Sequence, residues 1–409
     1  MKSIFIKLTF YLFVTINTLS AQVDKGKFVT YEPGFYHNVI MKELMGASSE
    51  QQNIKSNKQF KLDFNDRDYP TDISRYEVSF HSLPVSQGNS GTCWAYAATS
   101  FMESEVFREN KIKVKLSEIY IVYWEYIERA KYFVKTKGDT YLGEGSETNA
   151  ILRVMRDHGL VPYSVYTGLQ NDKSYNNHEE LFNEYETFLR SIKEKNIWDE
   201  NAVITEVKNI LEKYLGAPPN EFTYIDRTYS PETFLTDYLK LNPNNYFSFI
   251  STKYFPYNEK HELIENDNWW HCDDYYNLNL NDFMYLLNKA MTTGYTIGIC
   301  GDVSEPGYDQ ITEVAVIPDF DIPSPYINEN SRQLRLSNYS TTDDHCIHIV
   351  GYQKIDDIFW YLIKDSGSGA FDGKNKGYRF YHEDYIKLKI MNYMVHLDIA
   401  KEILDKIIK

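Results

Sequence analysis

The sequence predicts an α+β fold with two lobes, because helical patterns come first along the chain and strand patterns follow. From Cys93 onward, apolar residues recur three or four positions apart, which is the spacing of a buried helix face. After residue 295, short runs of β-branched and aromatic residues stand between Gly and Asp residues, which is typical of strands. This segregation favours a helical lobe joined to a strand lobe.

Helices are expected at three places in the first half of the chain. The first begins at Cys93, where the apolar periodicity starts. Ser117 is a suitable N-cap for a second helix that runs through Ala130. A third helix is expected over residues 150–158, because Gly159 follows it and glycine commonly ends helices. In the second half, strands are expected over residues 296–300, 345–350 and 359–363.

The first 21 residues are typical of a secretory signal peptide. Lys2 and Lys7 precede an apolar run over residues 8–14, and the small residue Ala21 ends the segment. We therefore expect a secreted or periplasmic protein, with a short buried helix or a membrane anchor as the alternative. The expected segments are the signal peptide (1–21), an N-terminal arm (22–75), a helical lobe (76–180), a mainly helical insertion (181–290), a β-rich lobe (291–395) and a C-terminal tail (396–409).

Composition limits the classes of partner. Apolar residues make up 43% and charged residues 25% of the chain, as in ordinary globular proteins. The formal net charge of −15 repels phosphate backbones and anionic lipids, so we expect no nucleic-acid partner and no membrane binding after signal removal. The 4 cysteines are too few for a disulfide framework in an exported chain of this length. They suggest one reactive thiol and a few buried ones.

Cys93 is the candidate nucleophile. It follows Gly and Ser residues at the start of a predicted helix, and the N-terminus of a helix stabilises a negative charge. Cysteine catalysis requires a thiolate, so this position suits the chemistry. Gln87, six residues earlier, offers a side-chain amide that can donate to an oxyanion beside the Cys93 backbone N–H. The alternative is a cysteine that only fills space in an apolar helix.

The segment QGNSGTCWAYAATSFMES, which starts at Gln87, resembles the active-site segment of papain-family cysteine peptidases. That family places its catalytic imidazole ahead of a strand ending in Val-Gly-Tyr, and DDHCIHIVGY places His345 there. On a strand, His345 and His348 point to opposite faces, so they are not expected to share one role. In YLIKDSGSGAFDG, Asp365 stands where the family has the Asn that orients the imidazole.

The resemblance narrows to the branch of bleomycin hydrolases and aminopeptidases C. EGSETNAILRVMRDHGLVP, from residue 144, resembles the substrate-binding turn and helix of that branch, and KLSEIYIVYWEYIERAKYF, from residue 115, resembles its next helix after the nucleophile. The separation of Cys93 and His345 exceeds the roughly 130–150 residues of ordinary papain-like enzymes, and a helical insertion accounts for it. The resemblance implies a papain-like two-lobed α+β fold with an antiparallel, barrel-like strand lobe.

The same resemblance implies roles for particular residues. The catalytic residues are Cys93, His345, Asp365 and Gln87, and the substrate-binding residues are Gly145, Ser146, Trp94 and Lys409. In this branch the C-terminal tail lies in the cleft, where its carboxylate pairs with the free amino group of the substrate and makes the enzyme an aminopeptidase. The alternative for this tail is a terminal helix packed on the surface. Members of the branch form hexamers, so a homo-oligomer is implied, with peptide or protein substrates and neither cofactor nor metal.

Three residues depart from the family pattern. Asp365 replaces Asn, but a carboxylate can still accept the imidazole N–H. Gly367 stands where the family has a Trp that shields this hydrogen bond, and Trp360 or Phe371 could take that place. Ser146 replaces a glycine, and its side chain could narrow the cleft.

Other classes of function have weaker support. Ser366-Gly-Ser-Gly lacks the flanks of a serine-hydrolase elbow. The histidines and cysteines near residues 271 and 345 lack a full set of metal ligands at zinc-like spacing. A catalytically impaired papain-like binding or scaffold protein is the main alternative, on account of the three departures. The intact Gln87, Cys93 and His345 favour a cysteine peptidase.

Overall fold

The computed structural model describes residues 24–45, 58–169 and 173–407, so the predicted signal peptide lies outside the described residues. None of the described helices has the length and apolar character needed to cross a bilayer. The described helices are α1 (Met41–Met45), α2 (Cys93–Asn110), α3 (Glu118–Lys135), α4 (Ala150–His158), α5 (Glu179–Glu194), α6 (Glu200–Leu215), α7 (Pro231–Thr233), α8 (Leu280–Thr292), α9 (Glu329–Ser337), α10 (Glu383–Lys389) and α11 (Leu397–Ile407).

The described strands extend from the N-terminal arm to the end of the chain. They are β1 (Gly26–Thr30), β2 (Lys58–Leu62), β3 (Glu77–Val78), β4 (Phe222–Tyr224), β5 (Arg227–Tyr229), β6 (Tyr246–Ile250), β7 (Lys260–His261), β8 (Tyr275–Asn277), β9 (Ile297–Gly301), β10 (Val314–Ala315), β11 (His345–Ile355), β12 (Ile358–Lys364), β13 (Tyr378–His382) and β14 (Ile390–His396). Among the described residues, the main sheet has ten strands in the order β10-β13-β12-β11-β9-β14-β6-β8-β7, with β3 paired to β11.

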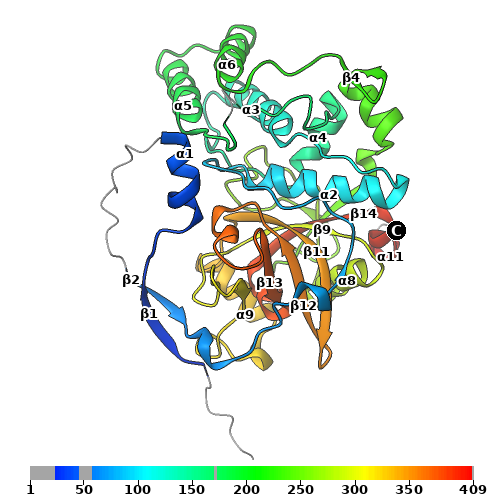
Figure 1. The fold of residues 1–409 in the computed structure, drawn as a ribbon. Helices are drawn as coiled ribbons and strands as arrows, with labels where there is room; N and C mark the ends of the chain where they lie inside the picture. The colour runs from blue at the N-terminus through cyan, green and yellow to red at the C-terminus, as the bar shows by residue number, and fades with distance from the viewer. Residues whose placement is uncertain (1–23, 46–57, 170–172, 408–409) are drawn as a thin grey trace, which may run out of the picture.

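The helical lobe contains α2 to α6, and Figure 1 shows these helices together above the sheet. The three predicted helices are confirmed as α2, α3 and α4. Ser117 caps α3, since its hydroxyl accepts a hydrogen bond from the Tyr120 backbone N–H at 3.0 Å. The helix continues past the predicted end at Ala130 to Lys135. Helix α4 ends before Gly159, whose φ of 70° suits glycine.

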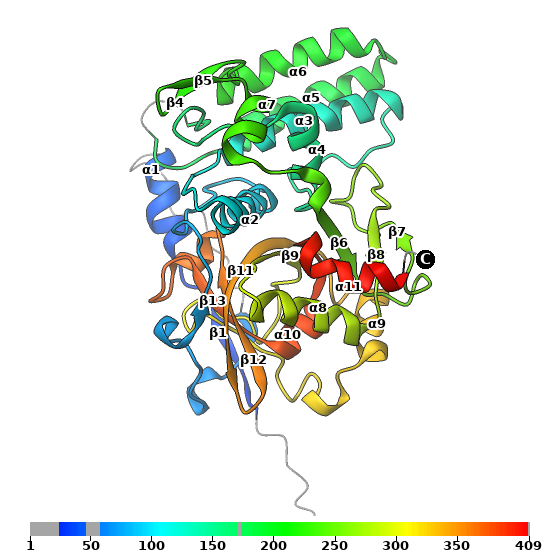
Figure 2. The same cartoon turned by 90° about the vertical axis from the view of Figure 1, so that its right-hand side faces the viewer.

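The central strands of the sheet are covered by helices on both faces. Because side chains alternate along a strand, neighbouring residues enter different cores. Cys300, Cys346 and Met394 pack with α2 in the core of the helical lobe, whereas Ile299, Ile347 and Tyr393 pack in a second core with α8 and α11. Figure 2 shows α2 on one side of β11 and α8 on the other. Helix α2 is thus fixed against the strand that begins with His345.

The segment predicted as a mainly helical insertion is helical in α5, α6 and α8, but it also contributes strands to the main sheet. Strand β6 pairs antiparallel with β14, and β8 pairs in parallel with β6. The runs YFSFI and YYN that form them are short and aromatic. Aromatic residues favour strands only where neighbours provide a packing surface. Here that surface is β14, which is distant in the sequence.

Cys300 and Cys346 form a disulfide, so the expectation that these were free buried thiols is wrong. The two residues lie directly opposite each other on the antiparallel strands β9 and β11. That register follows from strand pairing and is not visible in the cysteine count. Cys93 and Cys272 are the free cysteines of the described residues.

The N-terminal arm contacts both lobes along one side of the molecule, as Figure 1 shows in blue. Strand β2 is joined to the strand lobe by a hydrogen bond from the Leu62 N–H to the Pro306 carbonyl at 3.0 Å. Near α1, the Glu43 carbonyl accepts from Lys173 Nζ of the helical lobe at 2.7 Å. The arm therefore bridges the two lobes.

Candidate active site

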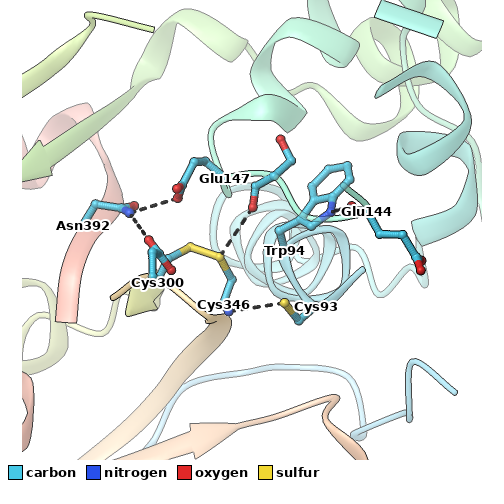
Figure 3. Close-up of a disulfide and its surroundings, with 9 residues drawn as sticks. Cys93, Trp94, Glu144, Glu147, Cys300, Cys346 and Asn392 are labelled. Atoms are coloured by element: carbon cyan, nitrogen blue, oxygen red, sulfur yellow. Dashed lines mark hydrogen bonds between the residues drawn. A yellow bond between two sulfur atoms is a disulfide. The ribbon is translucent and has the colours of Figure 1, made fainter. Parts of the chain in front are cut away.

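The structure brings Cys93 and His345 together from the two lobes. Cys93 is the first residue of α2, and His345 is the first residue of β11. The two side chains lie close enough for Cys93 to raise the pKa of the His345 imidazole. The Cys346 backbone N–H donates to Cys93 Sγ at 3.5 Å, as Figure 3 shows. A sulfur at a helix N-terminus beside an imidazole is suited to carry negative charge.

Asp365 lies beside the imidazole, where a residue that orients the ring was expected. His345 Nε2 lies 2.7 Å from Asp365 Oδ1, so the other ring nitrogen is left for Cys93. The Gly367 N–H donates to the same carboxylate oxygen at 2.7 Å. Burial would lower the pKa of His345, but the negative charges of Asp365 and Cys93 outweigh it and raise that pKa well above its ordinary value. The surroundings of the ring thus favour its protonated form.

Arg379 is a site residue that the sequence analysis missed. Its Nε donates to Asp365 Oδ2 at 3.0 Å, and both side chains are 1% exposed. The Tyr308 hydroxyl donates to the same oxygen at 3.4 Å, and the Arg379 guanidinium lies over the Tyr308 ring. A buried carboxylate requires such partners. Burial would raise the pKa of Asp365, but His345 and Arg379 hold it well below its ordinary value.

A sequence signal for Arg379 does exist. It is the lone cation in the strand Tyr-Arg-Phe-Tyr-His, whose central residues are buried. A buried arginine between aromatic residues indicates a buried anion nearby. The strand pairing that places β13 beside β12 identifies the anion as Asp365, at the end of β12.

Gln87 is fixed close to the nucleophile by hydrogen bonds on both ends of its amide. Its Nε2 donates to the Ser90 carbonyl at 2.7 Å, and its Oε1 accepts from the Ser366 hydroxyl at 2.8 Å. Its backbone N–H donates to the Ser366 carbonyl at 3.0 Å. An amide nitrogen has two N–H groups, so one remains to donate to an oxyanion. Ser366 thereby acts as a positioning residue for Gln87.

Trp94 does not have the predicted role in substrate binding. Its side chain is 0% exposed, so it cannot contact a substrate. Its indole N–H donates to the Glu144 carbonyl at 3.1 Å, and Glu144 Oε2 accepts from the Gly91 N–H at 2.9 Å. Trp94 and Glu144 therefore hold the predicted substrate-binding turn against the residues that precede Cys93.

The Ser146 side chain does not narrow the cleft. Its hydroxyl points into the helical lobe and donates to Glu125 Oε1 at 2.6 Å, and the residue is 2% exposed. Arg129 fixes the turn that contains Gly145, because its guanidinium donates to the Gly143 and Gly145 carbonyls. A serine is thus tolerated at position 146 because Glu125 accepts a hydrogen bond from its buried hydroxyl. The sequence alone does not show this pairing.

Neither aromatic residue expected to replace the family Trp covers the imidazole. The Trp360 ring packs against His382 with 5.0 Å between centroids, and the Phe371 ring stacks on Phe35 at 5.1 Å. The backbone of Gly367 itself lies against the hydrogen-bonded side chains of His345 and Asp365. A Cβ atom on Gly367 would be 3.1 Å from Asp365 Oδ1 and 3.2 Å from His345 Nε2. Close backbone packing replaces the aromatic side chain here.

A cavity of about 1660 Å³ opens beside His345 and Asp365. Residues 87–91 form one wall, residues 367–372 form the other, and residues 29–36 of the N-terminal arm cover it. The Tyr36 hydroxyl donates to Asn89 Oδ1 at 2.8 Å, which joins the arm to the helical lobe. The Phe35 N–H donates to Asp372 Oδ1 at 2.5 Å, which joins it to the strand lobe.

The described part of the C-terminal tail lies away from this cavity. Helix α11 follows His396, whose Nε2 is 3.2 Å from a carboxylate oxygen of Glu109 near the end of α2 opposite Cys93. Farther along α11, Glu402 pairs with Lys289 of α8 at 3.1 Å. Among the described residues, none of α11 lines the cavity. Lys409, predicted to bind substrate, lies outside the described residues.

Comparisons with known proteins agree with this geometry. Aminopeptidase C of Lactococcus lactis subsp. lactis (strain IL1403) is 23% identical over 373 residues, which cover 82% of this chain and 85% of that protein. Aminopeptidase C of Lactobacillus delbrueckii subsp. lactis is 25% identical over 267 residues, and the match spans 54% of this chain and 59% of that protein. The crystal structure of PepW from Lactobacillus rhamnosis HN001 has a TM-score of 0.67 at 21% identity, covering 83% of this chain and 85% of that one.

The likeness to PepW shows a shared fold, and it confirms the predicted papain-like α+β architecture. The family model described as Peptidase C1-like family matches residues 36–406, which is most of the chain. That span contains Gln87, Cys93, His345 and Asp365. The chain belongs to the Peptidase C1-like family.

Proposed function

We propose that this protein is a cysteine aminopeptidase that hydrolyses peptide bonds through Cys93 and His345. The observation that carries the proposal is the placement of Cys93 beside the strand that begins with His345. The Cys346 N–H is 3.5 Å from Cys93 Sγ, and Asp365 Oδ1 is 2.7 Å from His345 Nε2. The aminopeptidases C that resemble this chain support the exopeptidase part of the proposal. Peptides and proteins are the substrates expected for this family.

The arrangement assigns a role to each residue in the reaction. Cys93 Sγ attacks the carbonyl carbon, while Gln87 Nε2–H and the Cys93 backbone N–H donate to the oxygen that becomes negative. His345 gives its proton to the leaving amine, and the carbon–nitrogen bond breaks. Water, deprotonated by His345, then attacks the acyl carbon. The carbon–sulfur bond breaks, and Cys93 leaves as a thiolate beside the imidazolium. The raised pKa of His345 suits this acid role at neutral pH.

Export and assembly belong to the same proposal. The N-terminal pattern of Lys2, Lys7 and the apolar run supports secretion or a periplasmic location. The resemblance to the aminopeptidase C branch supports a homo-oligomer, with the hexamer of that branch as the expected form. Amino-terminal sequencing of the exported protein and its mass by light scattering test these two points.

An epoxide inhibitor of thiol peptidases tests the proposed function. We expect stoichiometric labelling at Cys93, detected by mass spectrometry, and no labelling in the His345→Ala variant. Cys272 is the matched control, because it is also free but burial raises the pKa of its thiol. Cys272→Ala should label as the wild type does. Absence of label on the folded wild-type protein would favour the scaffold alternative.

A further inference from the structure

The cavity lies on the imidazole side of the reactive thiol. His345 and Asp365 are among the residues that line it. In the turn predicted to bind substrate, Glu144 lines the cavity, whereas the next two described residues, Gly145 and Ser146, do not. The cavity therefore ends at this turn.

The chemistry of the proposed reaction decides which part of a peptide lies in the cavity. His345 protonates the leaving amine, so the part of the substrate that departs first must lie beside the imidazole and in the cavity. The acyl part, which stays on Cys93, must extend the other way from the sulfur. On that side the Cys346 N–H is 3.5 Å from Cys93 Sγ, and Cys346 Sγ is 3.9 Å from the Ser146 carbonyl oxygen.

The residues on the acyl side of the thiol are buried. Ser146, Glu147 and Cys346 are each covered almost completely, and so is Cys300, the disulfide partner of Cys346. An extended peptide needs about 3.3–3.6 Å of free length for each residue. These buried positions offer no such length, in contrast to the cavity on the other side.

Asp267 covers the turn at the point where the acyl part would continue. A Cβ atom on Gly145 would overlap the Asp267 carboxylate, so this carboxylate lies directly against the glycine. Asp267 belongs to the loop over residues 263–272, which lies in the connection between strands β7 and β8. A peptide that continued past Gly145 would collide with this loop.

The loop is fixed to the same side chains that hold the turn. The Trp269 indole N–H donates to Glu125 Oε1 at 2.8 Å, and the Ser146 hydroxyl donates to the same oxygen. The Arg129 guanidinium donates to the Gly145 carbonyl, and it lies 5.1 Å from the centre of the Trp269 ring. One carboxylate and one guanidinium thus hold the loop and the turn together.

The loop is also braced from within by Asn268, which is buried. Its Nδ2 donates to the carbonyls of Leu263 and Cys272, each at 3.0 Å. Its Oδ1 accepts from the Cys272 N–H at 2.9 Å. Moving the loop would break hydrogen bonds of a buried amide, which is costly. We therefore expect the loop to keep its place when a substrate binds.

We propose that the loop over residues 263–272, through Asp267, limits the substrate to a single residue before the bond that is cut. The limit arises from shape, because Asp267 covers Gly145 while the cavity receives the leaving part. This inference rests on the proposed aminopeptidase function and names the segment that restricts cleavage to the amino end. It assigns to a loop of the insertion the task that the family resemblance gave to the C-terminal tail.

Two coumarin substrates with a fixed cut site test the inference. Alanyl-coumarin has one residue before the bond, and acetyl-alanyl-alanyl-coumarin has two and a blocked amino end. For the wild type, we expect kcat/KM of the longer substrate to be lower by about a hundredfold or more. Asp267→Gly uncovers Gly145, so the ratio of longer over shorter substrate should rise about tenfold or more, through faster cleavage of the longer one.

The control variants separate shape from charge and from position in the chain. Asp267→Asn keeps the size of the side chain and removes its charge, so it should keep the wild-type ratio. Asp274→Gly changes an exposed aspartate in the same β7–β8 connection and should also keep it. Thermal unfolding identifies a variant that has lost its fold, and Asp267→Ala replaces Asp267→Gly in that case.

Product analysis provides a second readout. The wild type should release single amino acids from the amino end of an unblocked alanine pentapeptide, as followed by mass spectrometry. Asp267→Gly should release dipeptides as well. Deletion of residues 408–409 should leave the release of single amino acids in place, because the proposed limit lies in the loop.

Three results would overturn the inference. The first is a wild-type substrate ratio in folded Asp267→Gly and Asp267→Ala enzymes. The second is an equal rise of the ratio in Asp267→Asn, which would assign the limit to charge. The third is loss of the limit on deletion of residues 408–409, which would assign it to the tail. Failure of epoxide labelling at Cys93 refutes the proposed function instead, whereas these results leave it standing.

Discussion

Asp365 is held between two cations, and this arrangement explains why the catalytic imidazole can be oriented by a carboxylate. His345 lies 2.7 Å from one oxygen, and Arg379 donates to the other at 3.0 Å. A lone buried carboxylate would be costly, whereas one paired with both an imidazolium and a guanidinium is compensated. The Asp that stands in place of the family Asn thus has a second partner, Arg379, on the neighbouring strand.

Asp365→Asn should retain activity but shift its pH dependence. Both side chains can accept the imidazole N–H, so we expect a loss in kcat/KM below about a thousandfold, or about 4 kcal/mol. Removing the negative charge lowers the pKa of His345, so the alkaline limb of the kcat/KM profile should move to lower pH. In the wild type, the stability contributed by the raised pKa of His345 is fully present below about pH 6.5 and is lost as pH rises through the raised pKa. An unchanged alkaline limb would contradict this account.

Arg379→Met should destabilise the protein and disturb the site. It removes the partner of a buried carboxylate, a change worth about 3–5 kcal/mol in the free energy of unfolding. The double variant with Asp365→Asn should recover part of that loss, since neither charge is left alone. Arg75→Met is the control, because Arg75 is 76% exposed and its ion pair is worth about 0–1 kcal/mol. Urea unfolding of the wild type, the two single variants, the double variant and Arg75→Met measures these losses, and additive losses in the double variant would refute the coupling.

The candidate site residues could be predicted from the sequence, but the buried residues that contact them could not. Gln87, Cys93, His345 and Asp365 occur in local patterns whose spacing carries the chemistry. Arg379 and Tyr308 reach Asp365 only through strand pairing and loop packing, which the sequence does not display. The same limit applies to side-chain direction. Trp94 and Ser146 stand at the expected positions, but they point into the helical lobe.

At the level of elements, helix α2 and strands β9 and β11 fix the reacting groups. Cys93 begins α2, and His345 begins β11 directly before the disulfide at Cys346. The Cys346 backbone N–H reaches the Cys93 sulfur. The disulfide thus joins the strand that carries the imidazole to β9.

Removal of the disulfide should lower stability. Cys300 and Cys346 are 46 residues apart, and closing such a loop restricts the unfolded chain by about 4 kcal/mol. The variant Cys300→Ala/Cys346→Ala should lose about that free energy of unfolding in urea. Cys272→Ala, which removes a free cysteine, is the matched control and should lose less. Equal stability of the double variant and the wild type would show that the bond constrains little.

Among the elements, helices were easier to predict than strands. The caps and stops at Ser117 and Gly159 are local signals, and they correctly marked α3 and α4. Strand β6 pairs with β14, which comes more than a hundred residues later in the sequence, so its aromatic run gave no local sign of that partner. Strand β8 joins the main sheet through β6. The register that joins Cys300 to Cys346 is a non-local property of the same kind.

In the whole molecule, the candidate active site forms at the junction of the two lobes, and the N-terminal arm crosses this junction. The arm is tied to the helical lobe through Tyr36 and to the strand lobe through Phe35. Residues 29–36 of the arm line the cavity on one side of the site. A two-lobed body was predictable from the order of helices and strands. The path of the arm over the cavity was not, because it depends on contacts with both lobes.

We expect Cys93 and His345 to exist as a thiolate–imidazolium pair across the junction of the lobes. The pH dependence of Cys93 alkylation by iodoacetamide tests it most directly, with and without His345→Ala. We expect the wild-type protein to react rapidly at about pH 6, where an ordinary thiol is almost fully protonated. The His345→Ala protein should react slowly there and speed up only at alkaline pH. Identical profiles for the two proteins would contradict the account.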